Sequence, residues 1–170
     1  MSLKLMNPLI ETFELIKVDE KYAEFTDGGD DATLIEIRQA TQREHEKRAS
    51  VFNRISRTYS QMTDSTVREI QDIPWTELTR KEVFLTLAGC NIEDRDGSQL
   101  FLFKDGRLAM TFAEFTAAWG KLPPFVCQEM HKHVYDVNIA WSNAAKDMDE
   151  AVEDGLGTEV DETVPLASDA

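Results

Sequence analysis

Residues 100–148 constrain the fold more than any other stretch, because several signals for local structure follow one another there without a gap. Asp105-Gly106 lies between the apolar runs LFLF and LAM, and this dipeptide suits the type I′ turn of a β-hairpin. The T-x-x-E spacing that starts at Thr111 is that of a capping box, which begins a helix. We therefore expect a hairpin over residues 100–110, followed at once by a short helix.

A long helix is expected in the second half of this stretch. Gly120 suits the end of the short helix, and Pro123 and Pro124 suit the first turn of the next one. From there the apolar residues recur every three or four positions for about six turns, which is the repeat of an amphipathic helix. The stripe consists of Val126, Met130, Val134, Val137, Trp141, Ala145 and Met148.

The N-terminal part predicts a small antiparallel sheet. Runs of β-branched and aromatic residues over 13–18, 22–26 and 33–38 are typical of short strands. Residues 27–31 between the last two read DGGDD, in which the glycines permit positive φ and the aspartates bond their own backbone. The acidic residues around these glycines favour a turn over a phosphate-binding loop.

Residues 41–62 change to helical spacing. An apolar face is expected there from Ala49, Phe52, Ile55, Tyr59 and Met62. The basic cluster of the chain lies between them, at Arg43, Lys47, Arg48, Arg54 and Arg57. The neighbouring Glu44 and Glu46 favour a solvated face that pairs with acidic residues over a helix that binds nucleic acid.

A helix at the centre of the core is expected over the apolar run at 83–88. The T-x-x-E spacing from Thr79 predicts its start, and Gly89 suits its C-terminal end. The preceding residues 63–75 predict a short helix that stops ahead of Pro74.

These elements predict an α+β fold that is mainly α-helical, with a small N-terminal antiparallel β segment, a helical body holding one further β-hairpin, a long C-terminal helix and a disordered acidic tail. The 170 residues suffice for one domain with a substantial core. We expect a single compact domain over residues 1–149, made of the β segment (13–38) and the helical body (41–148, hairpin at 100–110). The tail is expected over residues 150–170.

Charge limits the classes of partner. With 18 basic and 32 acidic residues the net charge is −14, a field that repels phosphate backbones and anionic membranes. No nucleic-acid or membrane partner is therefore expected, whereas basic protein surfaces and metal cations fit. Beyond Lys146 the chain has nine acidic residues and no basic one, with too little apolar surface to fold. The start lacks the pattern of a signal peptide and no apolar run approaches the roughly 20 residues of a membrane span, so we expect an intracellular, soluble protein.

Metal, cofactor and catalytic chemistry are not predicted. An EF-hand register on either Gly97 or Gly106 places phenylalanine at the twelfth position, where a bidentate glutamate belongs. His131 and His133 lie two positions apart on a helix and point in different directions, so they cannot hold one ion together. We expect this pair to face solvent or a partner.

Two further groups of residues contain side chains that can bind metals or act as nucleophiles. Glu129 and His133 share a helix face, but a dimetal site needs a second such pair, which the sequence does not offer. Cys90 and Cys127 lie in apolar stretches that predict helices, and such surroundings raise a thiol pKa rather than activate the thiol.

The aromatic residues admit two interpretations. Trp75, Trp119 and Trp141 serve either as core or as part of a partner-binding patch, core packing being the more usual. The candidate partner-binding residues are Phe112, Phe115, Trp119, Val126, Met130, Val134 and Trp141.

Several short segments carry a family resemblance. They are a β segment leading into IRQAT (37–41), the polar helix EHEKRA, and WGKLPP (119–124) followed by a helix with Asn138 and Trp141. Over most of residues 30–145 the chain thereby resembles the tail assembly chaperones of long-tailed, siphovirus-type bacteriophages, although its N-terminal β segment is longer than expected for that family.

The resemblance implies a small, acidic, mainly helical protein without enzymatic activity, in the cytoplasm of the bacterial host. Its implied partners are the tape measure protein, which such chaperones coat, and the tail tube protein, whose subunits they recruit; self-association also stays open. Many members are extended at the C-terminus by a programmed frameshift, and this chain would be the short product.

Other classes remain as alternatives. One is a structural component of the virion, such as a head–tail connector or minor tail protein, and another is a metal-dependent enzyme. An acidic DNA mimic fits less well, because much of the negative charge is concentrated near the C-terminal end.

Overall fold

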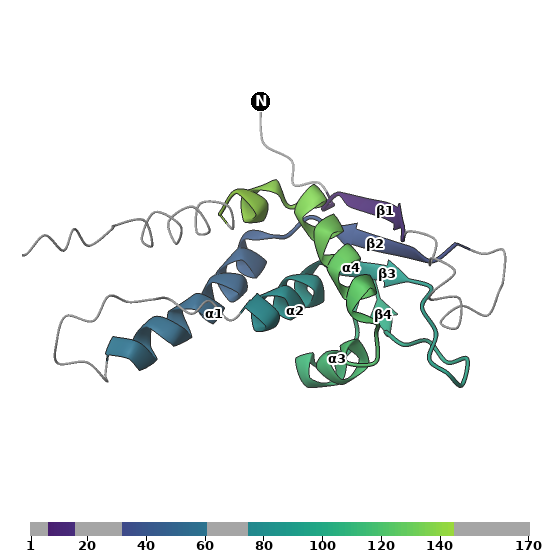
Figure 1. Ribbon diagram of the computed structural model, residues 1–170. Helices are drawn as coiled ribbons and strands as arrows, with labels where there is room; N and C mark the ends of the chain where they lie inside the picture. Colours follow the sequence, from purple (N-terminus) through teal and green to yellow (C-terminus); the bar gives the residue numbers. More distant parts are fainter. Residues whose placement is uncertain (1–6, 16–31, 61–74, 145–170) are drawn as a thin grey trace, which may run out of the picture. The chain divides into compact units, whose positions relative to one another are not determined.

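The computed structural model describes residues 7–15, 32–60 and 75–144, with residues 52–60 given by their backbone. The chain divides into two units, Met1–Asn138 and Ile139–Ala170, which are described separately. The fold is α+β, with small antiparallel sheets (Figure 1). The elements of the first unit are β1 (Ile10–Glu14), β2 (Leu34–Arg38), α1 (Gln42–Ser60), α2 (Trp75–Thr86), β3 (Leu87–Cys90), β4 (Phe103–Lys104), β5 (Arg107–Leu108), α3 (Phe112–Trp119) and α4 (Pro124–Val137).

The main sheet has the order β1-β2-β3 and both pairings are antiparallel. Phe13 pairs with Ile35 and Glu11 with Ile37, so these side chains share one face of the sheet. Ile35 and Ile37 are completely buried, and α4 packs across this face (Figure 1). The predicted antiparallel β segment is confirmed, although its first strand begins at Ile10 rather than at residue 13.

The third strand comes from a part of the chain where a helix was expected. α2 starts at Trp75 and ends at Thr86, and the chain passes directly into β3. The predicted helix over 83–88 is therefore wrong beyond Thr86, and Thr79 lies inside α2 rather than at its start. Short apolar runs suit a buried strand as well as a helix, and here pairing with β2 decides the outcome.

Gly89 belongs to this strand and does not cap a helix. It pairs with Glu36, and a Cβ at Gly89 would lie 2.5 Å from the Glu36 carboxylate oxygen Oε2. The missing side chain thus lets Glu36 lie across β3.

Helix α1 confirms the predicted helix over 41–62, but it buries a different face. Ala49 is exposed, whereas Glu44, Arg48 and Val51 are buried. The expected solvated basic face is therefore wrong at Arg48. The remaining members of the predicted apolar face lie among the residues without described side chains.

The hairpin and the helix after it follow the prediction closely. β4 and β5 are joined by Asp105 (φ 53°) and Gly106 (φ 67°), the two positive values of a type I′ turn. The paired strands are shorter than expected. Thr111 and Glu114 form both hydrogen bonds of the capping box at the start of α3.

Helix α4 starts at Pro124 as predicted but ends at Val137. Asn138 follows with φ −110° and ψ 67°, which is not helical. In the second unit residues 139–144 are helical again, so the predicted continuous helix is wrong beyond residue 137. Asn138 uses its side chain for hydrogen bonds to the backbone, the kind of local competition that ends helices.

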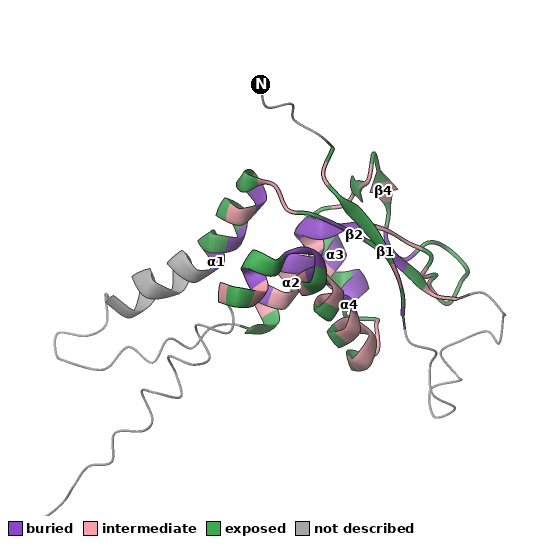
Figure 2. Cartoon of the chain, turned by 90° about the horizontal axis from the view of Figure 1, so that it is seen from above, coloured by how far each residue is buried: buried purple, intermediate pink, exposed green. Residues whose placement is uncertain are grey.

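The core of the first unit is rich in aromatic rings. Phe84, Phe101, Phe112 and Trp119 surround Phe115, with ring centroids 5.4–6.4 Å from it. In Figure 2 the helices have buried residues on one side, whereas most residues of strand β1 are exposed.

Some predictions concern residues outside the described ranges. They are the strand over 22–26, the helix over 63–74 and the acidic tail over 150–170. No helix within the described residues is both long and apolar enough to cross a membrane.

Candidate functional site

Most of the predicted partner-binding residues lie in the interior. Phe115, Trp119, Met130 and Val134 are buried in the first unit, and Trp141 is buried in the second. Phe112 and Val126 are half-buried, and the half-exposed Phe112 ring carries the Lys81 ammonium 4.5 Å from its centroid. Partner binding by these seven residues stays a prediction, but the surface available for it on α3 and α4 is small. Trp75, in contrast, is 40% exposed.

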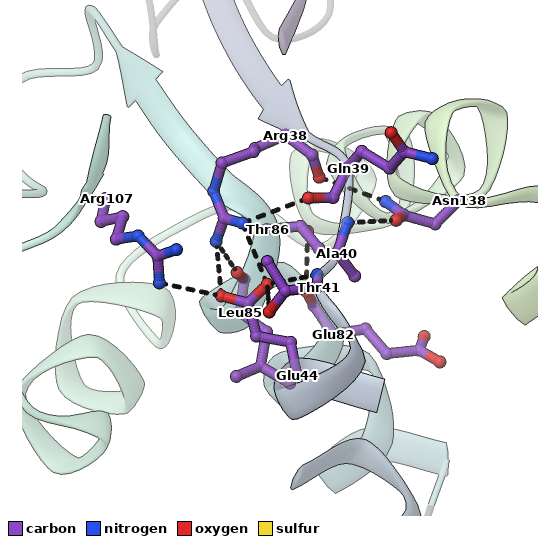
Figure 3. Close-up of polar contacts among 10 residues, drawn as sticks. All are labelled: Arg38, Gln39, Ala40, Thr41, Glu44, Glu82, Leu85, Thr86, Arg107 and Asn138. Atoms are coloured by element: carbon purple, nitrogen blue, oxygen red, sulfur yellow. Dashed lines mark hydrogen bonds and ion pairs between the residues drawn. The ribbon is translucent and has the colours of Figure 1, made fainter. Parts of the chain in front are cut away.

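A buried ion pair joins β2 to α1. The Arg38 guanidinium donates two hydrogen bonds to the Glu44 carboxylate, at 2.9 and 2.7 Å, and a third to the Leu85 carbonyl oxygen at 2.7 Å. Arg107 from β5 also reaches Glu44, at 3.2 Å, and Figure 3 shows both guanidinium groups converging on this carboxylate. Strand β2, helix α1 and the hairpin thus meet at the Glu44 carboxylate, and Arg38 connects them to α2.

The position of Glu44 follows from local sequence. Thr41 precedes α1, and both its N–H and its hydroxyl donate to Glu44 Oε2, at 2.8 and 3.0 Å. Burial by itself would raise the pKa of Glu44, but the hydrogen bonds from Arg38 and Thr41 and the Arg38 charge outweigh it and lower the pKa to about 2. Glu44 is therefore ionised at every physiological pH and holds its partners by charge.

Asn138 extends this network to the end of α4. Its amide oxygen accepts a hydrogen bond from the Ala40 N–H at 2.7 Å (Figure 3). Its amide nitrogen donates to the Val134 carbonyl oxygen at 3.1 Å. The segment between β2 and α1 is thereby tied to α4.

A second buried cluster surrounds Glu82 of α2, whose side chain has no exposed surface. Arg48 Nε of α1 lies 2.5 Å from Glu82 Oε1, and His131 Nε2 of α4 lies 2.5 Å from Oε2. This contact is a hydrogen bond between the imidazole ring and the carboxyl group. Tyr135 lies beside them, and burial first, then the Glu82 carboxylate, raises its pKa.

This arrangement makes Glu82 a structural acceptor. Both carboxylate oxygens are occupied by donors from two other helices and solvent does not reach the side chain. A general base must be within reach of a substrate proton, so Glu82 is not suited to that role in this conformation. What it does is hold α1, α2 and α4 together.

His133 faces the opposite direction from His131, as expected, but not towards solvent. Its ring stacks on Phe13 of β1 at 4.2 Å between centroids, and Nδ1 lies 3.0 Å from Asp136 Oδ2. Glu129 Oε1 is 3.9 Å from Nε2, on the shared helix face. The prediction that the two histidines face solvent or a partner is therefore wrong, since each contacts another element of the fold.

Burial also governs the cysteines. It raises the pKa of both Cys90 and Cys127 to about 11, as their apolar surroundings predicted. Cys90 lies in a strand rather than in the expected helix. Within the described ranges no three metal-ligating side chains are grouped so that they could hold a metal ion.

The face of the sheet opposite α4 carries exposed apolar and acidic side chains. Ile10 and Leu34 lie on it with exposures of 45% and 40%, together with the exposed Glu14 and Glu36. Leu9, just before β1, is 52% exposed. Large apolar side chains that can contact another chain are thus exposed at β1 and β2.

Comparison with protein-family models, with curated proteins and with solved structures finds no match to this chain. The geometry of its own residues is therefore the basis for the inferences that follow.

Sequence reasoning missed the residues that organise these networks. Arg38 ends an alternating strand, and Glu82 opens an apolar run; both positions carry a charge where the pattern places the core. Such a charge inside an apolar pattern is the signal that could have identified a buried pair. Its partner could not be identified, because Arg48 lies 34 positions from Glu82 in the chain.

Proposed function

We propose that this chain is a non-enzymatic tail assembly chaperone that binds the tape measure protein and helps to recruit tail tube subunits. The proposal places it in the cytoplasm of the bacterial host. It rests on the resemblance of the short segments quoted above and on the chemistry of the surface.

One observation carries the proposal: apolar side chains are exposed on an acidic sheet. Ile10 and Leu34 stand on the face of β1 and β2 opposite α4, where Glu14 and Glu36 are also exposed, while Phe115 and Trp119 of α3 are buried in the core. A chaperone must offer apolar contacts to its client and at the same time keep the complex soluble, and this surface supplies both. The buried ion pairs of Glu44 and Glu82 support the role by fixing the scaffold beneath it.

The acidic C-terminal region has its own part in the proposal. The acidic side chains of residues 150–170 supply negative charge that limits aggregation of the chaperone–client complex. A long, apolar client would otherwise associate with other copies of itself.

Co-expression with a tape measure protein tests the function. The soluble fraction of the client should rise in the presence of the chain and fall again with Leu34→Asp. Leu102→Asp is the matched control, because Leu102 is also an exposed leucine, at 55%, but lies outside the main sheet. Equal client solubility with and without the chain would contradict the proposal.

The rival function, a structural connector or minor tail component, makes a different prediction. A structural protein stays in the finished particle, whereas an assembly chaperone leaves it. Mass spectrometry of purified particles distinguishes the two: the chain in a fixed ratio to the tail proteins would contradict a chaperone.

A further inference from the structure

Strand β1 forms one edge of the main sheet. Its only strand partner among the described residues is β2, so its other side carries main-chain groups that no described strand satisfies. Such an edge is a template to which another extended chain can add.

The register shows which groups point outwards. Leu15 N–H donates to the Thr33 carbonyl at 2.8 Å and Gln39 N–H to the Leu9 carbonyl at 2.7 Å. Residues 9, 11, 13 and 15 therefore turn their main-chain groups towards β2. In an antiparallel ladder the alternate residues turn the other way, so the N–H and C=O groups of Ile10, Thr12 and Glu14 point to the outer edge.

The charges along this edge have one sign. Glu11 and Glu14 are exposed, and residues 7–15 include no lysine or arginine. On β2 the exposed charge is Glu36, since Arg38 is buried against Glu44. Because Glu11 and Glu14 lie on opposite faces of the sheet, an added strand with lysine or arginine at alternate positions would place positive charge beside Glu14 or, in the other orientation, beside Glu11.

The same charges disfavour a second copy of this chain. An antiparallel pairing of two β1 strands would gather Glu11 and Glu14 of both copies without a base between them. Each chain also carries a net charge of −14. Acidic side chains on an edge strand are a known means of preventing self-pairing.

We propose that the outer edge of β1 binds an extended segment of a basic partner protein, which adds to the sheet as a further antiparallel or parallel strand. Main-chain hydrogen bonds to Ile10, Thr12 and Glu14 hold the segment, and Glu14 on one face of the sheet or Glu11 on the other selects its basic residues. This goes beyond the proposed function, because it does not depend on the partner being a tape measure protein.

A synthetic peptide of alternating lysine and valine is the probe, labelled for fluorescence anisotropy and titrated with the full-length chain. It should bind, and binding should weaken as salt is raised. The same peptide with N-methylated backbone amides should not bind, because it keeps its charge but cannot join a ladder. Equal binding of both peptides would overturn the proposal, since charge alone would then explain it.

Variants of the chain locate the site. Thr12→Pro removes an outward N–H and no bond to β2, and should weaken peptide binding about fivefold to tenfold. The double variant Glu11→Gln/Glu14→Gln should weaken it about twofold to fivefold, because the lysines of an alternating peptide lie on one face and meet one of the two carboxylates. Glu46→Gln/Glu93→Gln removes the same charge at exposed positions outside this sheet and should leave binding unchanged.

Two other outcomes would also overturn the proposal. If Thr12→Pro binds the peptide as well as the wild type does, the peptide binds elsewhere. If sedimentation shows that the wild type is a dimer and Thr12→Pro a monomer, the edge binds a second copy of the chain. The thermal midpoint of Thr12→Pro shows that it is folded, and the N-methylated peptide gives its answer without any variant. If the client stays soluble in co-expression while the peptide fails to bind, this inference falls and the chaperone function stands.

Discussion

Arg48 Nε lies 2.5 Å from Glu82 Oε1, and the two side chains are 9% and 0% exposed. A buried ion pair contributes little beyond well-packed apolar residues, but removing one partner leaves an uncompensated charge in the interior. The pair therefore favours the observed arrangement of α1 and α2. Removing one of its two partners should lower the free energy of unfolding.

Glu82→Gln tests this relationship. The substitution keeps the volume but leaves Arg48 without its counter-charge, so the free energy of unfolding should fall by about 3 kcal/mol. Urea denaturation followed by circular dichroism measures it. Glu46→Gln, at an exposed position of α1, should change the same quantity by less than about 0.5 kcal/mol. Equal losses of unfolding free energy in the two variants would show that the buried ion pair contributes no more to stability than an exposed charge.

Acid should destabilise the protein through Glu44. Its pKa is lowered from 4.5 to about 2 in the folded state, so the stabilisation is fully present above pH 4.5 and is lost as the pH falls towards 2. Unfolding free energies measured by urea denaturation between pH 6 and pH 2 should therefore decline more steeply for the wild type than for Glu44→Gln. Parallel pH profiles for the two proteins would contradict this role.

The Asn138 side chain should contribute more to the free energy of unfolding than the side chains of its exposed neighbours. Asn138→Ala leaves the Ala40 N–H without its acceptor and should cost about 1–3 kcal/mol of unfolding free energy. Asn138→Asp keeps that acceptor oxygen but loses the donor to Val134, so it should cost less. Hydrogen exchange at the Ala40 amide reports the contact directly, and its protection should be lost in the alanine variant only.

The hairpin turn offers a test of backbone strain. Gly106 has φ +67°, and its Cβ would meet Ile10 only at an ordinary 3.6 Å, so Gly106→Ala should cost about 1 kcal/mol through conformation rather than through a clash. Gly120 has φ −64° and equally ordinary contacts, so Gly120→Ala should be neutral or stabilising. Thermal unfolding of both variants gives the comparison; equal costs would argue against strain.

The two cysteines should be slow to react. With the pKa raised from 9.0 to about 11, the thiolate fraction at pH 8 is roughly a hundredfold below that of an ordinary cysteine. Alkylation by iodoacetamide, followed by mass spectrometry, should be slow in the native protein and accelerate as the pH approaches 11. Rates equal to those of the urea-unfolded chain would contradict the burial of these thiols.

The T-x-x-E spacing shows how far sequence reasoning reaches in this chain. At Thr111 the spacing forms a complete capping box. At Thr41 the same spacing lets the Thr41 N–H donate to Glu44 at the start of α1, although no capping box was predicted there. At Thr79 it is a coincidence inside α2, and its glutamate is instead the buried partner of Arg48. The spacing is local, but whether it caps a helix depends on where the helix can pack.

The burial of most candidate partner-binding residues could not be predicted for a related reason. The stripes at Phe115, Trp119, Met130 and Val134 were correctly recognised as apolar helix faces, and periodicity alone does not distinguish a face that fills the core from one that meets a partner. The exposed apolar residues of β1 and β2 could not be identified as such, because which face of a sheet is covered depends on the helix that packs on it.

Sequence alone determined the elements whose signals are local: the Asp105-Gly106 turn, the capping box at Thr111, the start of α4 at Pro124 and the α+β class. These depend on φ preferences and on hydrogen bonds between residues a few positions apart. Only the tertiary structure decided that residues 87–90 form a strand, that Glu82 is buried between Arg48 and His131, and that α4 ends at Asn138. Each of these outcomes depends on contacts with residues tens of positions away in the chain. A local sequence pattern does not contain the free energy of such contacts.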